Sequence, residues 1–385
     1  MKILWVNSST TATMSNTRLY ALPPIFEKWG HPTYALLGGP KNEKSPDYFI
    51  TLPVPMGKLG AYRLLVKHLL PFICLRLRPD VVISDWMSGM LFQEVIAFRK
   101  MGLLKCKLVH DVRTVPVKDD AGKSWHVYAE SLKYARKHFD GVTTITELLR
   151  EEICQQFDYV EDQIAVWTSG VDVDHFKPQD GSEMRKKLGI EDKFVVFYHG
   201  AINENRGVVE FAQAAEHLKD LPDVRLVIVG KGNEWNRLEA IVKQKNLTQV
   251  ILQNGVPYAD MPKWIAMGDL CAVPLPDHPW WRVSSPLKLM EYQAMGKAIL
   301  LTEMKAHRAV ISNDSAAFYI PDTEPASFAE GIRRALAKRD SLAVLGEKGR
   351  ENAVSTLTWE NQARILRDYL EKVMIKSVQF GKHQG

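Results

Sequence analysis

In the stretch Ser285-Pro286-Leu287-Lys288-Leu289-Met290-Glu291, a serine and a proline are followed by two charged residues, Lys288 and Glu291, at helical spacing. Ser285 is a good helix N-cap, because its hydroxyl can accept a hydrogen bond from a free amide of the first turn. Pro286 suits the first helical position, where its missing N–H costs nothing. Gly296 can then end the helix in a left-handed conformation. The stretch therefore predicts a helix with both ends marked.

The start of such a helix can bind phosphate, because its free amides and the positive end of the helix dipole face the ligand. Glu291 lies nearly two turns further along, where a carboxylate can accept both hydroxyls of a ribose whose phosphates lie at the helix start. Lys288, in the first turn, opposes the dipole unless an anion is nearby. The alternative is an ordinary capped helix with Lys288 and Glu291 in solvent.

Three further loops follow buried strands and could line the same site. The strand 194–200 ends at Gly200, and Arg206 at the end of the next loop could clamp a diphosphate with its planar guanidinium. Arg206 could equally be a surface charge. Gly230 belongs to a lone Gly-x-Gly, which is weak evidence for phosphate binding, and Gly255 and Val256 follow the strand expected near 250–254.

His110 and Asp111 fall at the carboxyl end of a strand expected over 107–110. Functional side chains gather at such strand ends in doubly wound folds. Taken in isolation, however, a histidine there is more often a satisfied structural residue.

Buried strands alternate with helical stretches along most of the chain, which argues for parallel sheets. The expected strands lie at 3–6, 33–37, 81–84, 107–110, 141–145, 164–167, 194–200, 224–229, 250–254, 269–275, 298–302 and 316–320. The chain is thus of the α/β class.

The stretch from Ser285 to Lys297 resembles the nucleotide-sugar motif of family 4 glycosyltransferases. These have the GT-B fold, two Rossmann-like doubly wound domains facing a cleft. The resemblance implies that Glu291 holds the ribose of the donor nucleotide and that the amides of Ser285, Pro286 and Leu287 hold its diphosphate. It places the loops at Gly200, Gly230, Gly255 and Val256 beside the nucleotide.

The resemblance also implies catalytic roles for Arg206, Lys288 and His110. Arg206 occupies the place of a family lysine that contacts the diphosphate, and His110 resembles the histidine that approaches the donor sugar or its phosphates. Two positions depart from the family. Ala201 replaces an arginine, and Val283 replaces a glutamate that contacts the hexose.

The activity that the resemblance implies is transfer of a hexose from a nucleoside diphosphate sugar to an acceptor hydroxyl, with retention, in glycan or polysaccharide biosynthesis. The expected acceptor is a glycan or a lipid-linked molecule, and neither a metal nor another cofactor is expected. Asp172-Val173-Asp174 could hold a metal in a different fold, but it precedes an interdomain segment here. The alternative is a non-catalytic nucleotide-sugar-binding or scaffold protein, which Ala201 and Val283 favour.

The sequence predicts five segments. They are a first domain over 1–178, a linker over 179–193, a nucleotide-sugar-binding domain over 194–358, a final helix over 359–376 that returns to the first domain, and a tail over 377–385.

A net charge of +5 on 385 residues is far from a nucleic-acid-binding pattern, so no nucleic acid is expected as partner. The four scattered cysteines and the absence of a signal peptide predict a reduced, cytoplasmic protein. The basic amphipathic stretch 59–78 could touch the inner face of a membrane, or it could pack on the sheet with its charges in water. Pro71 is expected to interrupt its helix.

Overall fold

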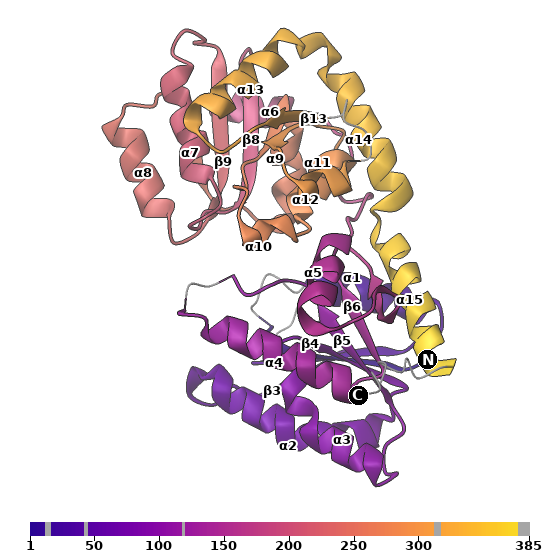
Figure 1. Cartoon of the computed structure of the whole chain (residues 1–385). Coiled ribbons are helices and arrows are strands. Elements are labelled where there is room, and N and C mark those ends of the chain that lie inside the picture. The colour runs from indigo at the N-terminus through magenta and orange to yellow at the C-terminus, as the bar shows by residue number, and fades with distance from the viewer. Residues whose placement is uncertain (12–16, 42–44, 118–119, 312–316, 376–385) are drawn as a thin grey trace. The chain divides into compact units, whose positions relative to one another are not determined.

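The computed structural model describes residues 1–11, 17–41, 45–117, 120–311 and 317–375 of the chain. The chain divides into two compact units (Figure 1). The first unit contains residues 1–169 together with the segment from Trp359 onwards, and the second contains Gly170–Thr358.

The first unit is built on a seven-stranded parallel sheet in the order β3-β2-β1-β4-β5-β6-β7. Its strands are β1 (Ile3–Thr10), β2 (Thr33–Gly38), β3 (Phe49–Leu52), β4 (Val81–Asp85), β5 (Lys107–Val112), β6 (Gly141–Thr144) and β7 (Ile164–Val166). Its α-helices are α1 (Thr17–Lys28), α2 (Leu59–Leu77), α3 (Gln93–Lys100), α4 (Lys123–His138), α5 (Glu147–Phe157) and α15 (Trp359–Ile375).

Both faces of this sheet are buried, which is why its strands read as continuous apolar runs. In β1, Ile3 and Trp5 join the core under α1 and α15, whereas Leu4 and Val6 join the core under α2 and α3. Successive side chains of a strand point to opposite faces, so four consecutive apolar residues supply both layers.

The second unit has a six-stranded parallel sheet in the order β10-β9-β8-β11-β12-β13. Its strands are β8 (Phe194–Ala201), β9 (Val224–Lys231), β10 (Val250–Asn254), β11 (Leu270–Val273), β12 (Ala298–Thr302) and β13 (Ala317–Ile320). Its α-helices are α6 (Ser182–Leu188), α7 (Val208–Gln213), α8 (Trp235–Gln244), α9 (Met261–Ala266), α10 (Pro279–Arg282), α11 (Leu287–Ala294), α12 (Lys305–Val310), α13 (Pro325–Ala337) and α14 (Leu342–Thr356).

The boundaries of the units differ from the segments expected from the sequence. The first unit ends at Ser169 rather than at 178, and residues 179–193 belong to the second unit instead of forming a free linker. They hold α6, whose Arg185 pairs with Asp269 at 2.8 Å and donates to the Met267 carbonyl. The helix α15 belongs to the first unit and packs on α1, while the expected tail over 377–385 lies outside the described residues.

The helix α2 runs without a break through Pro71, so the expected interruption is wrong. Proline removes only one backbone donor from the helix ladder. Leu70, Pro71 and Cys74 are buried, and Leu70 and Cys74 belong to the core of the first sheet, which holds the helix across the missing bond. Among the described residues, no helix combines the length and the apolar character needed to cross a bilayer.

Candidate functional site

The strand order of the second unit places a topological switch point between β8 and β11, from which the chain winds outward in opposite directions. Open parallel sheets bind ligands at the carboxyl ends of the strands beside such a point. His199, Gly200 and Ala201 end β8 there. The helix α11, which carries Lys288 and Glu291, follows β11 through the short helix α10.

The helix α11 begins at Leu287, one residue later than expected. Pro286, with φ −73° and ψ 113°, is the N-cap, and proline has no side-chain group that could cap the first turn. The prediction of Ser285 as N-cap and Pro286 at the first helical position is therefore wrong, because the extended backbone continues through Pro286. Ser285 is buried beside the helix start.

The far end of α11 is as predicted. Gly296 has φ 64°, and the Lys297 amide donates to the Tyr292 carbonyl at 3.0 Å. Glycine adopts this left-handed conformation without steric cost, so it ends the helix and turns the chain into β12.

Lys288 is buried, with 8% of its surface exposed, so the alternative of a solvated lysine does not hold. Its Nζ lies 5.2 Å from the centre of the Tyr198 ring, and a Cβ added to Gly200 would lie 3.0 Å from Lys288 Cε. Burial, together with the positive charge of Arg206, lowers the pKa of Lys288 to about 7, while Glu291 opposes the shift. A buried lysine at a helix N-terminus is poised to gain a proton when an anion binds.

Glu291 is partly buried, and it is already engaged by a histidine. Its Oε2 lies 2.8 Å from His199 Nε2, and their side chains are 12% and 10% exposed. The other ring nitrogen, Nδ1, lies 3.0 Å from the hydroxyl of Tyr292, which also accepts the His199 backbone N–H at 3.0 Å. The carboxylate that the sequence singles out is thus held by two neighbours that sequence reasoning missed.

Arg206 lies on the loop between β8 and α7, with its guanidinium 4.7 Å from the centre of the Trp281 ring. The indole N–H of Trp281 donates to the Asn205 carbonyl at 2.6 Å, so α10 and this loop are tied together. Because Arg206 lowers the pKa of Lys288, the two cations share one electrostatic environment. Together they can stabilise a diphosphate.

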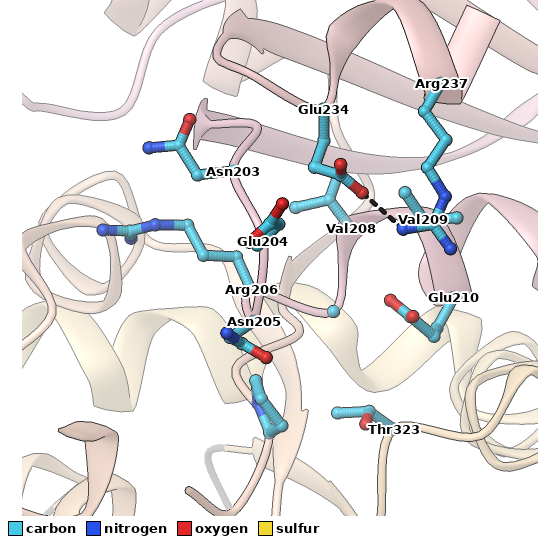
Figure 2. A pocket seen from close by; sticks show the side chains of 12 residues that line it. Asn203, Glu204, Asn205, Arg206, Val208, Val209, Glu210, Glu234, Arg237 and Thr323 are labelled. Carbon is cyan, nitrogen blue, oxygen red and sulfur yellow. Dashed lines mark hydrogen bonds and ion pairs between the residues drawn. The ribbon is translucent and has the colours of Figure 1, made fainter. Parts of the chain in front are cut away.

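A cavity of about 330 Å³ is lined by residues 203–210, Arg206 included, and by Glu234, Arg237, Pro276 and Thr323 (Figure 2). Its carboxylates are Glu204, Glu210 and Glu234, the last paired with Arg237 at 2.6 Å. The side chain of Arg206 points away from that pair. Arg206 and Arg237 also line this cavity, which leaves one net negative charge among its charged residues, so it is less suited to a diphosphate than the start of α11.

At each of the three predicted glycines, a side chain would meet a neighbouring group. Gly200, with φ 137°, lies opposite Gly230, where an added Cβ would lie only 2.0 Å from the Gly200 carbonyl oxygen. Gly255, with φ 66°, is covered by the side chain of Lys231, and Val256 after it is partly buried. Lys231 is exposed at the end of β9 and adds a cation that the sequence reading did not single out.

His110 is fully buried in the first unit. Its Nδ1 lies 2.9 Å from the Ser84 hydroxyl, and an added Cβ at Gly89 would lie 2.7 Å from its ring. Burial lowers its pKa to about 3, so the ring is neutral at ordinary pH. The ring has no exposed surface, because alternation along β5 turns it into the core while Asp111 faces the other side.

Asp172 accepts hydrogen bonds from the backbone amides of Asp174 and His175, both at 3.0 Å. The Asp-x-Asp triplet thus shapes its own turn. Within the described parts of the chain, histidines, cysteines and carboxylates do not gather in groups of three or more that could hold a metal ion.

The chain matches two protein families over most of its length. Residues 180–352 match Glycosyl transferases group 1, and residues 26–175 match Glycosyltransferase Family 4. Among curated proteins, the chain is 25% identical to Spore coat protein SA of Bacillus subtilis over 251 residues, covering 60% of this chain and 64% of that protein.

It is also 25% identical to the UDP-Gal:alpha-D-GlcNAc-diphosphoundecaprenol alpha-1,3-galactosyltransferase of Escherichia coli, covering 59% of each protein. The matched parts span between 57% and 66% of the length of four curated relatives, one of which is Spore coat protein SA. Among solved structures, HepE of Anabaena in complex with UDP and glucose superposes with a TM-score of 0.78 at 16% identity, covering 97% of this chain and 100% of that one. The fold is therefore GT-B.

Proposed function

Because the chain belongs to the family 4 type of glycosyltransferases, we propose that it transfers a hexose from a nucleoside diphosphate sugar to an acceptor hydroxyl, with retention at the anomeric carbon. The observation that carries the proposal is the buried Lys288 at the start of α11, three residues before Glu291. One helix thereby offers a cation to a diphosphate and a carboxylate to a ribose.

Departure of a nucleoside diphosphate leaves negative charge that has to be stabilised. Lys288, Arg206 and the first amides of α11 supply positive charge for this purpose. We therefore propose that no metal ion is needed. Retention and the hexose are proposed from the family resemblance.

The proposed acceptor is a glycan or a lipid-linked molecule. The Escherichia coli relative supports this choice, because its name describes transfer to a sugar carried on a diphosphate lipid. A lipid-linked acceptor would require the protein to work at a membrane surface.

We propose contact with the cytoplasmic face of a membrane through α2. Leu64, Phe72 and Leu75 on this helix are 58%, 60% and 38% exposed, although they are large and apolar. The helix contains no acidic residue, and Arg63, Lys67 and Arg76 are on it. Exposed apolar side chains flanked by cations are suited to an anionic bilayer. The alternative is a helix packed on the sheet with its charges in water.

Sedimentation with lipid vesicles tests this contact. Wild type should pellet with vesicles that contain phosphatidylglycerol and not with vesicles of pure phosphatidylcholine, and Leu64→Ser/Phe72→Ser should remain in the supernatant. Val344→Ser is the matched control, because Val344 is 61% exposed on a helix of the other unit. Equal pelleting of the double variant and the control would contradict the proposal.

A non-catalytic nucleotide-sugar-binding protein on the same fold is the rival, since Ala201 and Val283 replace charged family residues. Release of nucleotide from UDP-, GDP- and ADP-sugars by the purified protein, with and without a lipid-linked acceptor, separates the two. If the protein is an enzyme, it should turn over one of these sugars, and Lys288→Ala should reduce the rate at least about a hundredfold. This is the scale of losing one group that stabilises charge in the transition state. Nucleotide binding without any turnover would favour the rival.

A further inference from the structure

The hydrogen bonds around Glu291 have a fixed direction. The backbone N–H of His199 can only donate, so the Tyr292 oxygen accepts it. Among the described residues, His199 Nδ1 is the one acceptor within hydrogen-bond distance of the buried Tyr292 hydroxyl, so the single hydroxyl proton points to Nδ1, which accepts. Tyr292 is fully buried, and burial raises its pKa well above the ordinary value, so it keeps this proton.

The direction determines which ring nitrogen of His199 carries hydrogen. With Nδ1 accepting, the neutral ring has its proton on Nε2, which donates to Glu291 Oε2 at 2.8 Å. The chain of donors therefore runs from the backbone of β8 through Tyr292 and His199 to the carboxylate. Each link is between groups that are at least 88% buried, which limits alternative rotamers.

Because the imidazole of His199 is neutral in this tautomer, the Glu291 carboxylate keeps its negative charge and can accept further hydrogen bonds. An arginine or lysine in the same place would neutralise the carboxylate and occupy several lone pairs. The imidazole occupies one lone pair, and no other hydrogen bond to the Glu291 carboxylate occurs within the described residues. Oε1 and the remaining lone pair of Oε2 stay available to two adjacent hydroxyls, and the negative charge is retained.

We propose that His199 is a positioning residue that holds Glu291 for the two hydroxyls of a ribose, and that Tyr292 sets the tautomer of His199. This inference rests on the proposed nucleotide site. It makes discrimination between ribose and 2′-deoxyribose depend on His199, which has no direct part in the transfer.

The test compares the affinity for UDP, GDP and ADP with that for their 2′-deoxy forms by calorimetric titration. Wild type should bind one ribonucleotide more tightly than its deoxy form, and His199→Leu should reduce that ratio about tenfold, the scale of one hydrogen bond to a charged group. His199→Gln should keep most of the ratio, because its amide N–H can reach Glu291 in place of Nε2. The deoxynucleotide is an internal control, since general damage to the site weakens both forms.

An unchanged ratio in His199→Leu, with both affinities reduced, would mean that the histidine only supports the fold and would overturn the inference. Absence of binding to every nucleotide by wild type would instead count against the proposed function, so the two failures are distinguishable. Nitrogen-15 spectra of labelled histidine give a second readout. A wild-type His199 ring protonated on Nδ1 would contradict the assigned tautomer, whereas one protonated on Nε2 supports it.

Discussion

At the scale of single residues, the site depends on a lysine whose charge is not fixed. Burial and the neighbouring Arg206 lower the pKa of Lys288 to about 7. A diphosphate favours the protonated lysine, so binding above this pKa requires the uptake of a proton. The affinity should therefore fall as the pH rises.

We expect the dissociation constant of the bound nucleoside diphosphate to rise by up to about tenfold per pH unit between pH 7 and pH 9, as linkage to one proton requires. Titration calorimetry at several pH values measures this directly. Lys288→Arg should bind with little pH dependence, because a guanidinium stays charged over this range. A wild-type affinity that is constant from pH 7 to pH 9 would show that Lys288 is already charged without ligand.

The sequence predicts Lys288, Glu291 and Arg206 correctly as neighbours in one unit, because helix spacing and strand–loop–helix order are local patterns. It does not predict His199 or Tyr292, whose partners are 92 or more positions distant in the chain. The rule that favoured His110, a histidine at a strand's carboxyl end, applies equally to His199. Only the packing distinguishes a histidine buried under Gly89 from one aimed at a carboxylate.

At the scale of elements, the loop that carries Arg206 is held by a glycine. Gly207 has φ 66°, and a Cβ added to it would lie 1.9 Å from the Pro274 carbonyl oxygen. Gly189 has nearly the same conformation, φ 64°, with nothing within 4 Å of an added Cβ. The two positions separate the cost of the backbone conformation from the cost of the clash.

We expect Gly189→Ala to lower the free energy of unfolding by about 1 kcal/mol, the cost of a left-handed alanine. Gly207→Ala should lower it by at least about twice as much, because backbone has to move, and should also weaken nucleotide binding by shifting Arg206. Calorimetric unfolding and nucleotide titration of both variants measure the two effects. Equal losses of stability in the two variants would mean that the loop adapts without strain.

Elements were predicted well where apolar runs are long and less well at their ends. The strand Phe49–Leu52 is absent from the sequence reading, because a four-residue edge strand gives little periodic signal. The start of α11 is displaced by one residue, and α2 continues through Pro71. In both cases the structure departs from the local preference of a proline, which is to occupy the first helical position in α11 and to interrupt the helix in α2.

At the scale of the whole molecule, two parallel sheets with opposite winding from a central strand follow from the alternation of strands and helices. The exact limits of the units do not follow from this alternation. The sequence of residues 179–193 is that of a polar connector, but in the structure Arg185 pairs with Asp269 and the segment belongs to the second unit. Placement of the nucleotide site in the second unit depends on α11 facing the end of β8.

Thermal unfolding with UDP, GDP and ADP, on wild type and on Glu291→Ala, tests whether the nucleotide binds at α11. A ligand at about 100 times its dissociation constant adds roughly 2.7 kcal/mol to the free energy of unfolding, which shifts the midpoint by a few degrees. We predict a shift with one nucleotide in wild type and little or none in Glu291→Ala. An equal shift in both proteins, or no shift of wild type with any of the three, would contradict the account.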